Sequence, residues 1–188
     1  MSEKVLLHVC CAQCAIGAFE ALNEERFEVK GYFHNPNIHP LIEFRRRLKA
    51  VKTLRDSMKL DIEYNENYGL REYLGAIAGR EYERCHVCYS LRFGAACAKA
   101  ADEEIGLVTT TLFSSPHQDH GLIAEVGAQE AKKHGVEFLV RDFRPRSESA
   151  HEKTKKMKLY RQQYCGCIFS EYERYKDTNL HIYKEDRE

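Results

Sequence analysis

Proline, glycine and long apolar runs are scarce in this chain of 188 residues. It has only 4 prolines and 11 glycines, and no linker of low complexity. We therefore expect one domain, residues 1–188, with a core over about 4–175 and a short charged tail. The apolar runs fall far short of the roughly 20 residues that a membrane helix needs. The opening KVLLHVCC has too short an apolar core for a secretory signal. We expect a cytoplasmic protein without a membrane partner.

Net charge and nucleotide motifs are missing as well. Lys and Arg together number 29, as do Asp and Glu, so the formal net charge is zero. The protein as a whole is not drawn to polyanions, and any affinity for nucleic acid must come from local patches. The sequence has no GxGxxG motif, P-loop, RNP motif or KH motif, so no motif supports a nucleotide cofactor.

The chain does contain an alternation of β-rich and helical segments. Strands are expected at 5–9, 28–34, 60–64, 107–113 and 136–143, and helices at 14–25, 41–58, 70–79, 86–104, 120–134 and 149–160. This alternation is typical of an α/β protein. We predict a single Rossmann-like domain with a mainly parallel sheet of about five strands. Helices should cover both faces, and the Cys-Gly-Cys segment near the C-terminus should be helical.

Cysteine is the most informative residue type. Seven of the eight cysteines form three groups: CCAQC at 10–14, CHVC at 85–88 and CGC at 165–167. In a reducing compartment this clustering favours metal over disulfides. In open α/β sheets, ligands bind beyond the C-terminal ends of the strands, where helices begin, and a helix N-terminus stabilises a thiolate. CCAQC follows the first strand and CHVC opens a helix, so these two groups should face one pocket.

The number of thiols exceeds what one metal centre uses. A tetrahedral zinc or a [4Fe–4S] cluster takes four thiolates, which leaves three. Those three suggest a second metal with an open coordination position, or a redox pair. Cys97, in the alanine-rich stretch FGAACAKAA, is expected to be buried and inert.

Two basic segments and one acidic residue are further candidates. We interpret FRRRLKAVK (44–52) as a solvated helix face. HEKTKKMKLYRQQY (151–164) combines cations with Tyr160 and Tyr164, a combination that suits phosphates and stacked bases of loop RNA. Asp119 is a candidate oxygen ligand or proton donor, with a solvated loop carboxylate as the alternative.

Taken in order, five segments resemble the QueH family of cobalamin-independent epoxyqueuosine reductases. They are LLHVCCAQC, YFHNPNIHP followed by EFRRR, RCHVCYSLR, TTTLFSSP and LYRQQYCGCIFSEYERY, and the resemblance spans residues 5 to about 175. It implies reductive deoxygenation of epoxyqueuosine to queuosine at the wobble position of a tRNA anticodon loop. It also implies a [4Fe–4S] cluster, an adjacent mononuclear iron and an external electron donor such as a ferredoxin or flavodoxin.

The resemblance also implies site residues. The metal ligands should be Cys10, Cys11, Cys14, Cys85, Cys88, Cys165 and Cys167, with their division between cluster and lone iron left open. We expect the cofactor on Cys10, Cys11, Cys85, Cys88, Cys165 and Cys167, and catalytic roles for Cys11, Cys14, Cys167 and Asp119. Substrate contacts are expected from Asn35, Asn37, His39, Arg92, Tyr160, Arg161, Gln162 and Tyr164.

The chain departs from the family pattern at two places. Gln13 stands where proline is expected, and His117, Gln118 and Asp119 replace an aromatic-Lys-Asn run, so the substrate contact expected from that Lys is either absent or supplied by another residue. The leading alternative function is a zinc-stabilised RNA-binding module without catalysis. A tRNA thiolase would need an SGGxDS-type loop after the first strand, and a thiol–disulfide oxidoreductase would need only one CxxC.

Overall fold

The structure, a computed structural model, describes residues 2–178 and contains a five-stranded sheet in which every strand pairing is parallel. The strands are β1 (Lys4–His8), β2 (Glu28–Phe33), β3 (Ile62–Tyr64), β4 (Leu107–Thr110) and β5 (Glu137–Phe138). In β1, Val5, Leu6 and Leu7 are fully buried. A continuous apolar run of this kind is what a parallel strand covered on both faces requires.

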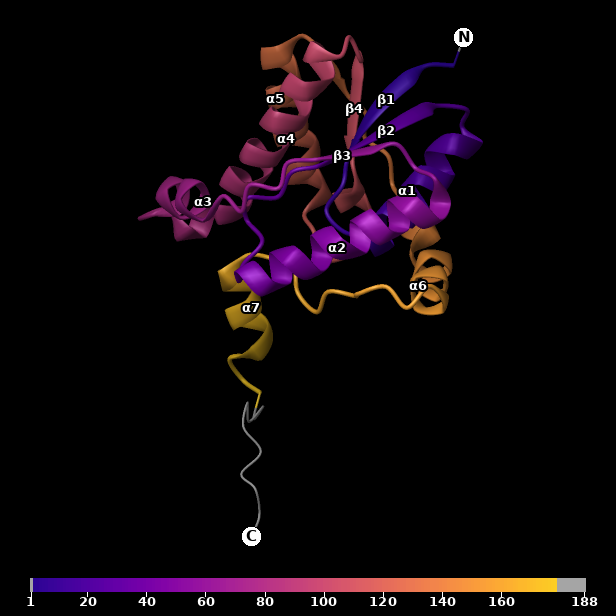
Figure 1. Ribbon diagram of the computed structural model, residues 1–188. Helices are drawn as coiled ribbons and strands as arrows, with labels where there is room; N and C mark the ends of the chain where they lie inside the picture. The colour runs from indigo at the N-terminus through magenta and orange to yellow at the C-terminus, as the bar shows by residue number, and fades with distance from the viewer. Residues whose placement is uncertain (1, 179–188) are drawn as a thin grey trace.

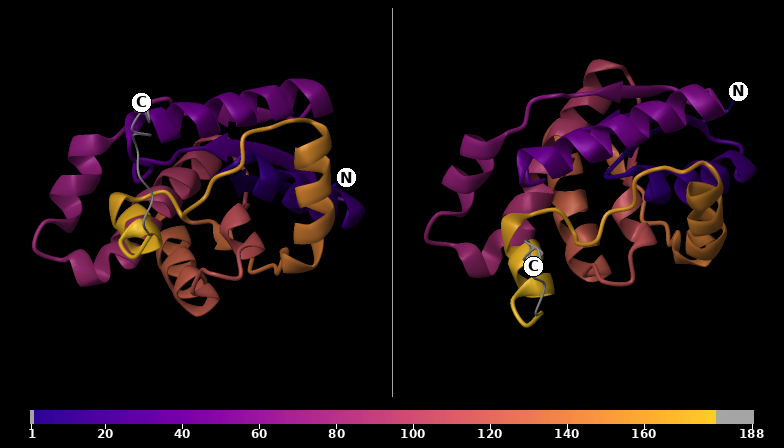
Figure 2. Two further views of the ribbon diagram at one scale, coloured as in Figure 1. Left: turned by 90° about the horizontal axis from the view of Figure 1, so that it is seen from below. Right: turned by 60° about the horizontal axis from the view of Figure 1, so that its bottom comes forward.

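Seven α-helices surround the sheet of the described chain. They are α1 (Ala12–Glu24), α2 (Leu41–Met58), α3 (Leu70–Ile77), α4 (Arg84–Asp102), α5 (His120–His134), α6 (Ser147–Lys156) and α7 (Ile168–Tyr175). Helix α1 packs against β2, α2 and α6 on one face, whereas α4 packs against β1, β4 and α5 on the other (Figures 1 and 2). The predicted α/β domain with helices on both faces is confirmed.

The strand order is β3-β2-β1-β4-β5. The chain therefore leaves β1 toward one side of the sheet and later returns to pair β4 with the other side of β1. The crevice at such a reversal of strand order is where open α/β sheets bind ligands. Here the segments that leave β1 and β4 are CCAQC and the 3₁₀ helix Thr111–Ser114.

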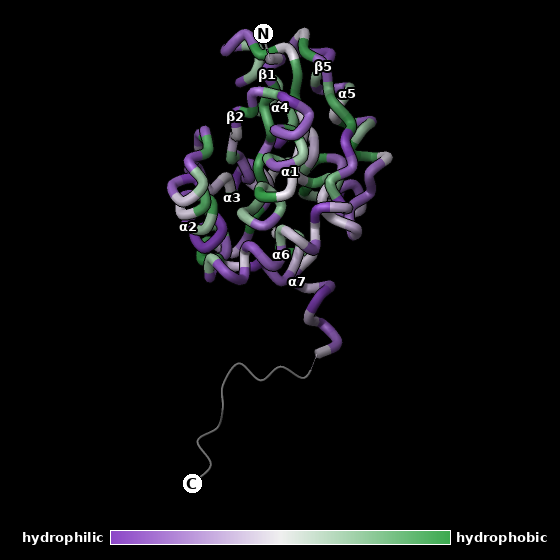
Figure 3. The backbone as a smooth tube through the Cα atoms, turned by 90° about the vertical axis from the view of Figure 1, so that its right-hand side faces the viewer, coloured by the Kyte–Doolittle hydropathy of each residue, from purple (hydrophilic) through white to green (hydrophobic). Residues whose placement is uncertain are grey.

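Hydrophobic residues run along the central strands, and α7 at the lower end is mostly hydrophilic (Figure 3). The main core includes Phe19, Phe33, Phe93 and Phe113, and a smaller cluster around Leu6 and Val108 encloses Cys97. In the described part of the chain, no helix is long and apolar enough to cross a membrane.

Four segments differ from the sequence predictions. Strand β4 ends at Thr110, and β5 is only two residues long, because the chain turns away after Phe138 and leaves Val140 exposed. Helix α6 ends at Lys156, and Lys158 adopts a positive φ of 52°. Cys165 and Gly166 are not helical; Gly166 has a φ of 139°, a value that favours glycine, and helix α7 begins only after Cys167. The predicted charged tail lies largely outside the described residues.

Candidate metal centre

The first group of thiols lies directly after β1, at the reversal of strand order. The Sγ atoms of Cys10, Cys11 and Cys14 all lie within 4.8 Å of one another, and those of Cys10 and Cys11 are 3.7 Å apart. Cys11 is the N-cap of α1, and its Sγ accepts a hydrogen bond from the Cys14 amide at 3.4 Å. We call these residues the three-thiol set.

Neighbouring side chains donate hydrogen bonds to this set. Thr111 Oγ1 donates to Cys10 Sγ at 3.1 Å, and Gln162 Nε2 donates to Cys11 Sγ at 2.9 Å. Hydrogen bonds from the thiols of Cys11 and Cys14 lower the pKa of Cys10 well below its ordinary value. Contacts with Cys10 and Cys11 raise the pKa of Cys14, and the contact with Cys10 raises that of Cys11 to about 12. Of the three thiols, Cys10 is therefore the one whose surroundings favour the thiolate most.

The second group combines two chain segments. Cys85 and Cys88 lie at the start of α4, while Cys165 and Cys167 flank Gly166 just before α7. Withdrawal of the thiol groups from water is the main cause that raises the pKa values of Cys85, Cys88 and Cys165, although Cys85 and Cys165 as whole residues are exposed. The thiolate forms of Cys165 and Cys167 further raise the pKa of both Cys85 and Cys88. We call these four residues the four-thiol set. Among the described residues, only the three-thiol set brings three such ligand atoms within 4.8 Å, so the four-thiol set is more widely spaced.

A buried cation lies between the two sets. Arg92 is 1% exposed, and its guanidinium donates to Cys88 Sγ at 3.7 Å, Asn35 Oδ1 at 2.7 Å and His8 Nε2 at 3.2 Å. Burial acts against the charge of Arg92, whereas the Cys88, Cys10 and Cys165 thiols, when deprotonated, raise its pKa. None of the ion pairs between described residues involves Arg92, so no carboxylate neutralises it.

The other two partners of Arg92, Asn35 and His8, are buried and neutral. Asn35 accepts from Arg92 and donates to the Val9 carbonyl at 3.0 Å. His8 contacts Thr110 Oγ1 at 2.8 Å through Nδ1. Burial and the nearby Arg92 charge lower the pKa of His8 to about 3, so its ring is uncharged at neutral pH.

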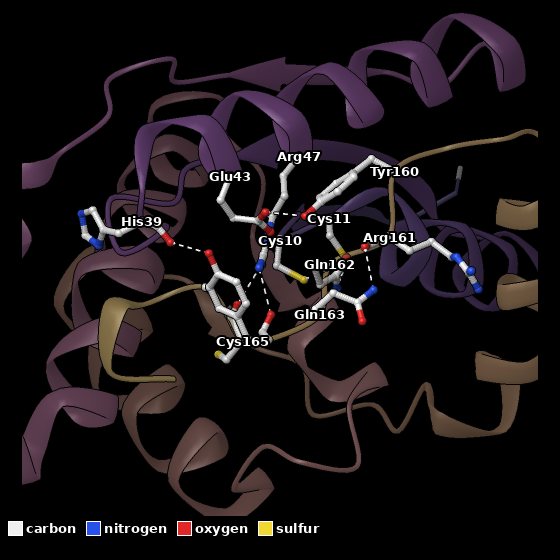
Figure 4. A network of polar contacts seen from close by, with 12 residues as sticks. Cys10, Cys11, His39, Glu43, Arg47, Tyr160, Arg161, Gln162, Gln163 and Cys165 are labelled. Atoms are coloured by element: carbon white, nitrogen blue, oxygen red, sulfur yellow. Dashed lines mark hydrogen bonds and ion pairs between the residues drawn. The ribbon is translucent and has the colours of Figure 1, made fainter. Parts of the chain in front are cut away.

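The other residues predicted to bind substrate fall into two places. Asn37 and His39 are buried, and their side-chain nitrogen and oxygen atoms have no hydrogen-bond partner among the described residues; the same holds for the Tyr73 hydroxyl. Tyr160, Arg161, Gln162 and Tyr164 lie on residues 157–167, the extended segment between α6 and α7 (Figure 4). Within this segment Arg161 is exposed and contacts the ring of His151 at 2.9 Å, whereas the Tyr164 hydroxyl donates to the His39 carbonyl at 2.7 Å.

Asp119 lies at the surface as the N-cap of α5, where its Oδ1 accepts from the Leu122 amide at 3.0 Å. Its neighbour Gln118 reaches the thiols instead, with Nε2 3.4 Å from Cys165 Sγ and Oε1 accepting from the Tyr89 hydroxyl at 2.8 Å. A carboxamide therefore contacts the four-thiol set in the segment that departs from the expected family pattern.

Five residues at the site were given no role by the sequence analysis: Glu43, Arg47, Tyr73, Thr111 and Gln118. The sequence did contain a sign that Glu43 and Arg47 are buried. They are spaced i, i+4 and lie next to the apolar positions Phe44 and Leu48 on the predicted helix. Arg47 was included in a charge run interpreted as solvated, but its side chain is only 2% exposed. Beside Cys14, a small hollow of about 20 Å³ lies between α1, α6 and the end of the 3₁₀ helix, lined in part by Gln13, Ser114 and Arg146.

Comparison with known proteins gives a consistent result. Residues 5–173 match the family described as "Epoxyqueuosine reductase QueH". A protein of that name from Dehalococcoides mccartyi is 38% identical over 95% of this chain and 98% of its own length. Two others so named, from Thermotoga maritima and Helicobacter pylori, are 31% and 36% identical; the alignments cover 90% and 88% of this chain, and 91% and 49% of those proteins.

Proposed function

Because the chain belongs to the epoxyqueuosine reductase QueH family, an oxidoreductase family, we propose that it converts epoxyqueuosine to queuosine in tRNA. The epoxide takes up two electrons and two protons, its two C–O bonds break, and the products are an alkene and water. An external donor must therefore supply two electrons for each epoxide. Since the sequence has no motif for a nucleotide cofactor, the thiols are the groups that can hold a redox centre.

The buried Arg92 is the observation that supports a metal centre most directly. Removing an ion from water costs several kcal/mol even after the protein relaxes, unless opposite charge lies close by. Arg92 is 1% exposed and has thiols, and no carboxylate, as potential anions within the described chain. Thiolates are also the form of cysteine that binds metal. The cation thus fits a site in which both thiol sets are deprotonated and metal-bound.

The spacing of the thiols fits two different groups. Two sulfurs on one tetrahedral ion, with metal–sulfur bonds of about 2.3 Å, lie roughly 3.8 Å apart. The 3.7 Å between Cys10 and Cys11 suits a single ion, and three thiols leave its fourth position open. We propose that the three-thiol set holds the mononuclear iron. The four more widely spaced thiols of Cys85, Cys88, Cys165 and Cys167 supply the number of ligands that a [4Fe–4S] cluster takes.

When bound, the cluster would supply electrons and the single iron a Lewis-acid centre for the epoxide oxygen. The chain's own residues keep this chemistry in a defined environment. Arg92 balances negative charge between the sets, and Thr111 and Gln162 orient Cys10 and Cys11 through hydrogen bonds. Such contacts to metal ligands tune both affinity and reactivity. Because Asn35 and Arg92 are buried among the ligands, we now assign them to this supporting role.

The substrate would approach from the side of residues 157–167 and the hollow beside Cys14. A wobble base is unpaired in the anticodon loop, so little energy is needed to bring it into a protein site. We propose that Arg161, which is exposed on this segment, contacts a phosphate or ribose, while Gln162 faces the reacting base from its place beside Cys11. Electrons from a ferredoxin- or flavodoxin-like donor would enter through Cys85, an exposed member of the four-thiol set.

The test is conversion of epoxyqueuosine-containing tRNA by anaerobically prepared, chemically reduced protein, with digested nucleosides analysed by mass spectrometry. We expect queuosine from the native protein and from Cys97→Ala, whose cysteine lies in the separate core cluster, but none from Cys11→Ser. Protein that holds iron and sulfide but leaves epoxyqueuosine intact would contradict the proposal. Equal binding of modified and unmodified tRNA by a zinc-containing protein would favour the RNA-binding module.

A further inference from the structure

Residues 157–167 carry two of the four thiols of the four-thiol set without being part of a helix or strand themselves. This segment, which we call the strap, leaves α6 and runs alongside α2 to α7 (Figures 1 and 2). Because no regular hydrogen-bond ladder holds it, the position of Cys165 and Cys167 depends on contacts that the strap makes with the rest of the fold.

One arginine makes several of these contacts. Arg47 Nη1 donates to the Cys165 carbonyl at 2.8 Å, and Nη2 donates to the Tyr164 carbonyl at 2.9 Å (Figure 4). Its guanidinium also lies 5.6 Å from the centroid of the Tyr164 ring. The planar fork of arginine can reach two consecutive carbonyls at once, which a lysine ammonium on its single flexible stem does not reproduce.

Glu43 fixes the orientation of Arg47 from one turn earlier on α2. Its Oε1 accepts from Arg47 Nε at 2.6 Å, and its Oε2 accepts from the Tyr160 hydroxyl. The side chains of the ion pair are 5% and 2% exposed. The pair thus holds the strap at both Tyr160 and the Tyr164–Cys165 peptide.

The backbone of the strap is adapted to this contact. Gly166 lies against Arg47, and a Cβ at position 166 would be 3.2 Å from Nη1 and 3.1 Å from a side-chain carbon of Ile38. The Gly166 carbonyl in turn accepts from the His39 amide at 2.7 Å. Close approach of the backbone on both sides leaves Cys165 and Cys167 with little freedom of position.

A buried ion pair is weak evidence for stability, because apolar residues of similar size often stabilise a protein as well or better. A role in positioning explains why it is present here. We propose that Arg47, oriented by Glu43, is a positioning residue that holds the Cys165-Gly166-Cys167 backbone so that both thiols face Cys85 and Cys88. What these four thiols hold rests on the proposed function, but the clamp on the strap does not.

The first test measures how well Cys167, a buried thiol, is protected in the metal-free protein. Alkylation by iodoacetamide under anaerobic conditions is followed residue by residue with mass spectrometry. Arg47→Met should label at Cys167 at least tenfold faster than the native protein, and Arg47→Lys should lie between them. Arg45→Met, on the exposed side of α2, is the matched control and should match the native rate. Cys97, buried in the separate core cluster, reports the integrity of the fold and should stay protected throughout.

Unchanged labelling of Cys167 in Arg47→Met would overturn the proposal. A parallel rise at Cys97 would also count against it, since Arg47 would then support the whole fold and not the strap. Tyr160→Phe gives an independent test, because it removes one contact of Glu43 and leaves Arg47 in place. We expect it to speed labelling of Cys167 at least twofold without affecting Cys97; labelling at the native rate would contradict the role of Glu43.

The second readout is metal content. After reconstitution with iron and sulfide, Arg47→Met should keep less than half of the sulfide of the native protein, while Co²⁺ binding by the three-thiol set stays within twofold. Equal sulfide content in the two proteins would contradict the positioning role. If the native protein itself takes up no sulfide, the proposed cofactor is wrong, and the labelling result still decides whether Arg47 holds the strap.

Discussion

Replacing Asn35 by alanine tests whether the charge of Arg92 is as tightly enclosed as the structure indicates. Asn35 is fully buried, accepts from Arg92 at 2.7 Å and donates to the Val9 carbonyl at 3.0 Å. Alanine would leave a carbonyl and one end of a guanidinium buried without these partners. Each orphaned group costs about 1–3 kcal/mol, more when it is charged, so we expect a loss of about 2–5 kcal/mol. That is a large part of the roughly 5–15 kcal/mol by which a domain is stable.

The assay is urea unfolding of metal-free protein, followed by circular dichroism. With a urea dependence of about 2 kcal/mol per M, the midpoint should fall by about 1–2.5 M. Asn35→Asp keeps an oxygen for Arg92 and adds the missing negative charge. Its free energy of unfolding should therefore exceed that of Asn35→Ala by at least about 1 kcal/mol. The exposed Asn23→Ala should change stability by no more than about 0.5 kcal/mol. A loss below about 1 kcal/mol in Asn35→Ala, or equal losses for alanine and aspartate, would refute this reasoning.

Three further predictions concern a histidine, a metal-ligand contact and a helix–sheet contact. Burial and the Arg92 charge lower the pKa of His34 to about 4, so this residue takes up a proton in the unfolded chain first as the pH falls below about 6.5. The contribution of His34 alone should lower the stability by up to about 2 kcal/mol from pH 7 to pH 5, and His8 adds a similar effect. In His34→Gln this part of the pH dependence should vanish in urea unfolding, and its persistence would contradict the assignment. Thr111→Val removes the hydroxyl that donates to Cys10, and should weaken Co²⁺ binding by the three-thiol set 10- to 100-fold in chelator competition; unchanged affinity would contradict this contact. Gly127→Ala would place a Cβ 2.2 Å from the ring of Phe138 and should cost about 1–3 kcal/mol by thermal unfolding, whereas an unchanged melting temperature would argue against this packing.

The fold was predictable to the extent that it depends on local patterns. The apolar spacing in residues 41–58 and 120–134 gave helices whose bounds the structure reproduces. The strands were located, although β5 is much shorter than expected because it ends at an exposed edge. The strand order could not be derived, because pairing β1 with β4 depends on contacts about 100 residues apart. That pairing brings Thr111 to Cys10.

The site was predictable in its residues more than in its arrangement. The three cysteine groups were visible as sequence motifs, but their separation into a three-thiol and a four-thiol set depends on how α4 and the strap approach one another. Arg92 was expected to contact the substrate. Its spacing from Tyr89, Phe93 and Ala96 on the buried face of α4 was the available sign that it points inward.

The strap was the least predictable part. Its basic residues and Tyr160 suggested a continued helix, yet α6 ends four residues earlier and the chain becomes extended. The reason is tertiary: the Tyr160 hydroxyl meets Glu43, and the following carbonyls meet Arg47. Contacts between α2 and a segment more than 100 residues away outweigh the local helix propensity.

The most direct test of the metal centre is the amount of iron, acid-labile sulfide and zinc per chain, with an absorption spectrum, in protein purified without oxygen. A cluster on the four-thiol set and an ion on the three-thiol set predict about four sulfides, more than four irons and a broad band near roughly 400 nm from thiolate-to-iron charge transfer. Colourless protein with one zinc and no sulfide would contradict the reductase mechanism.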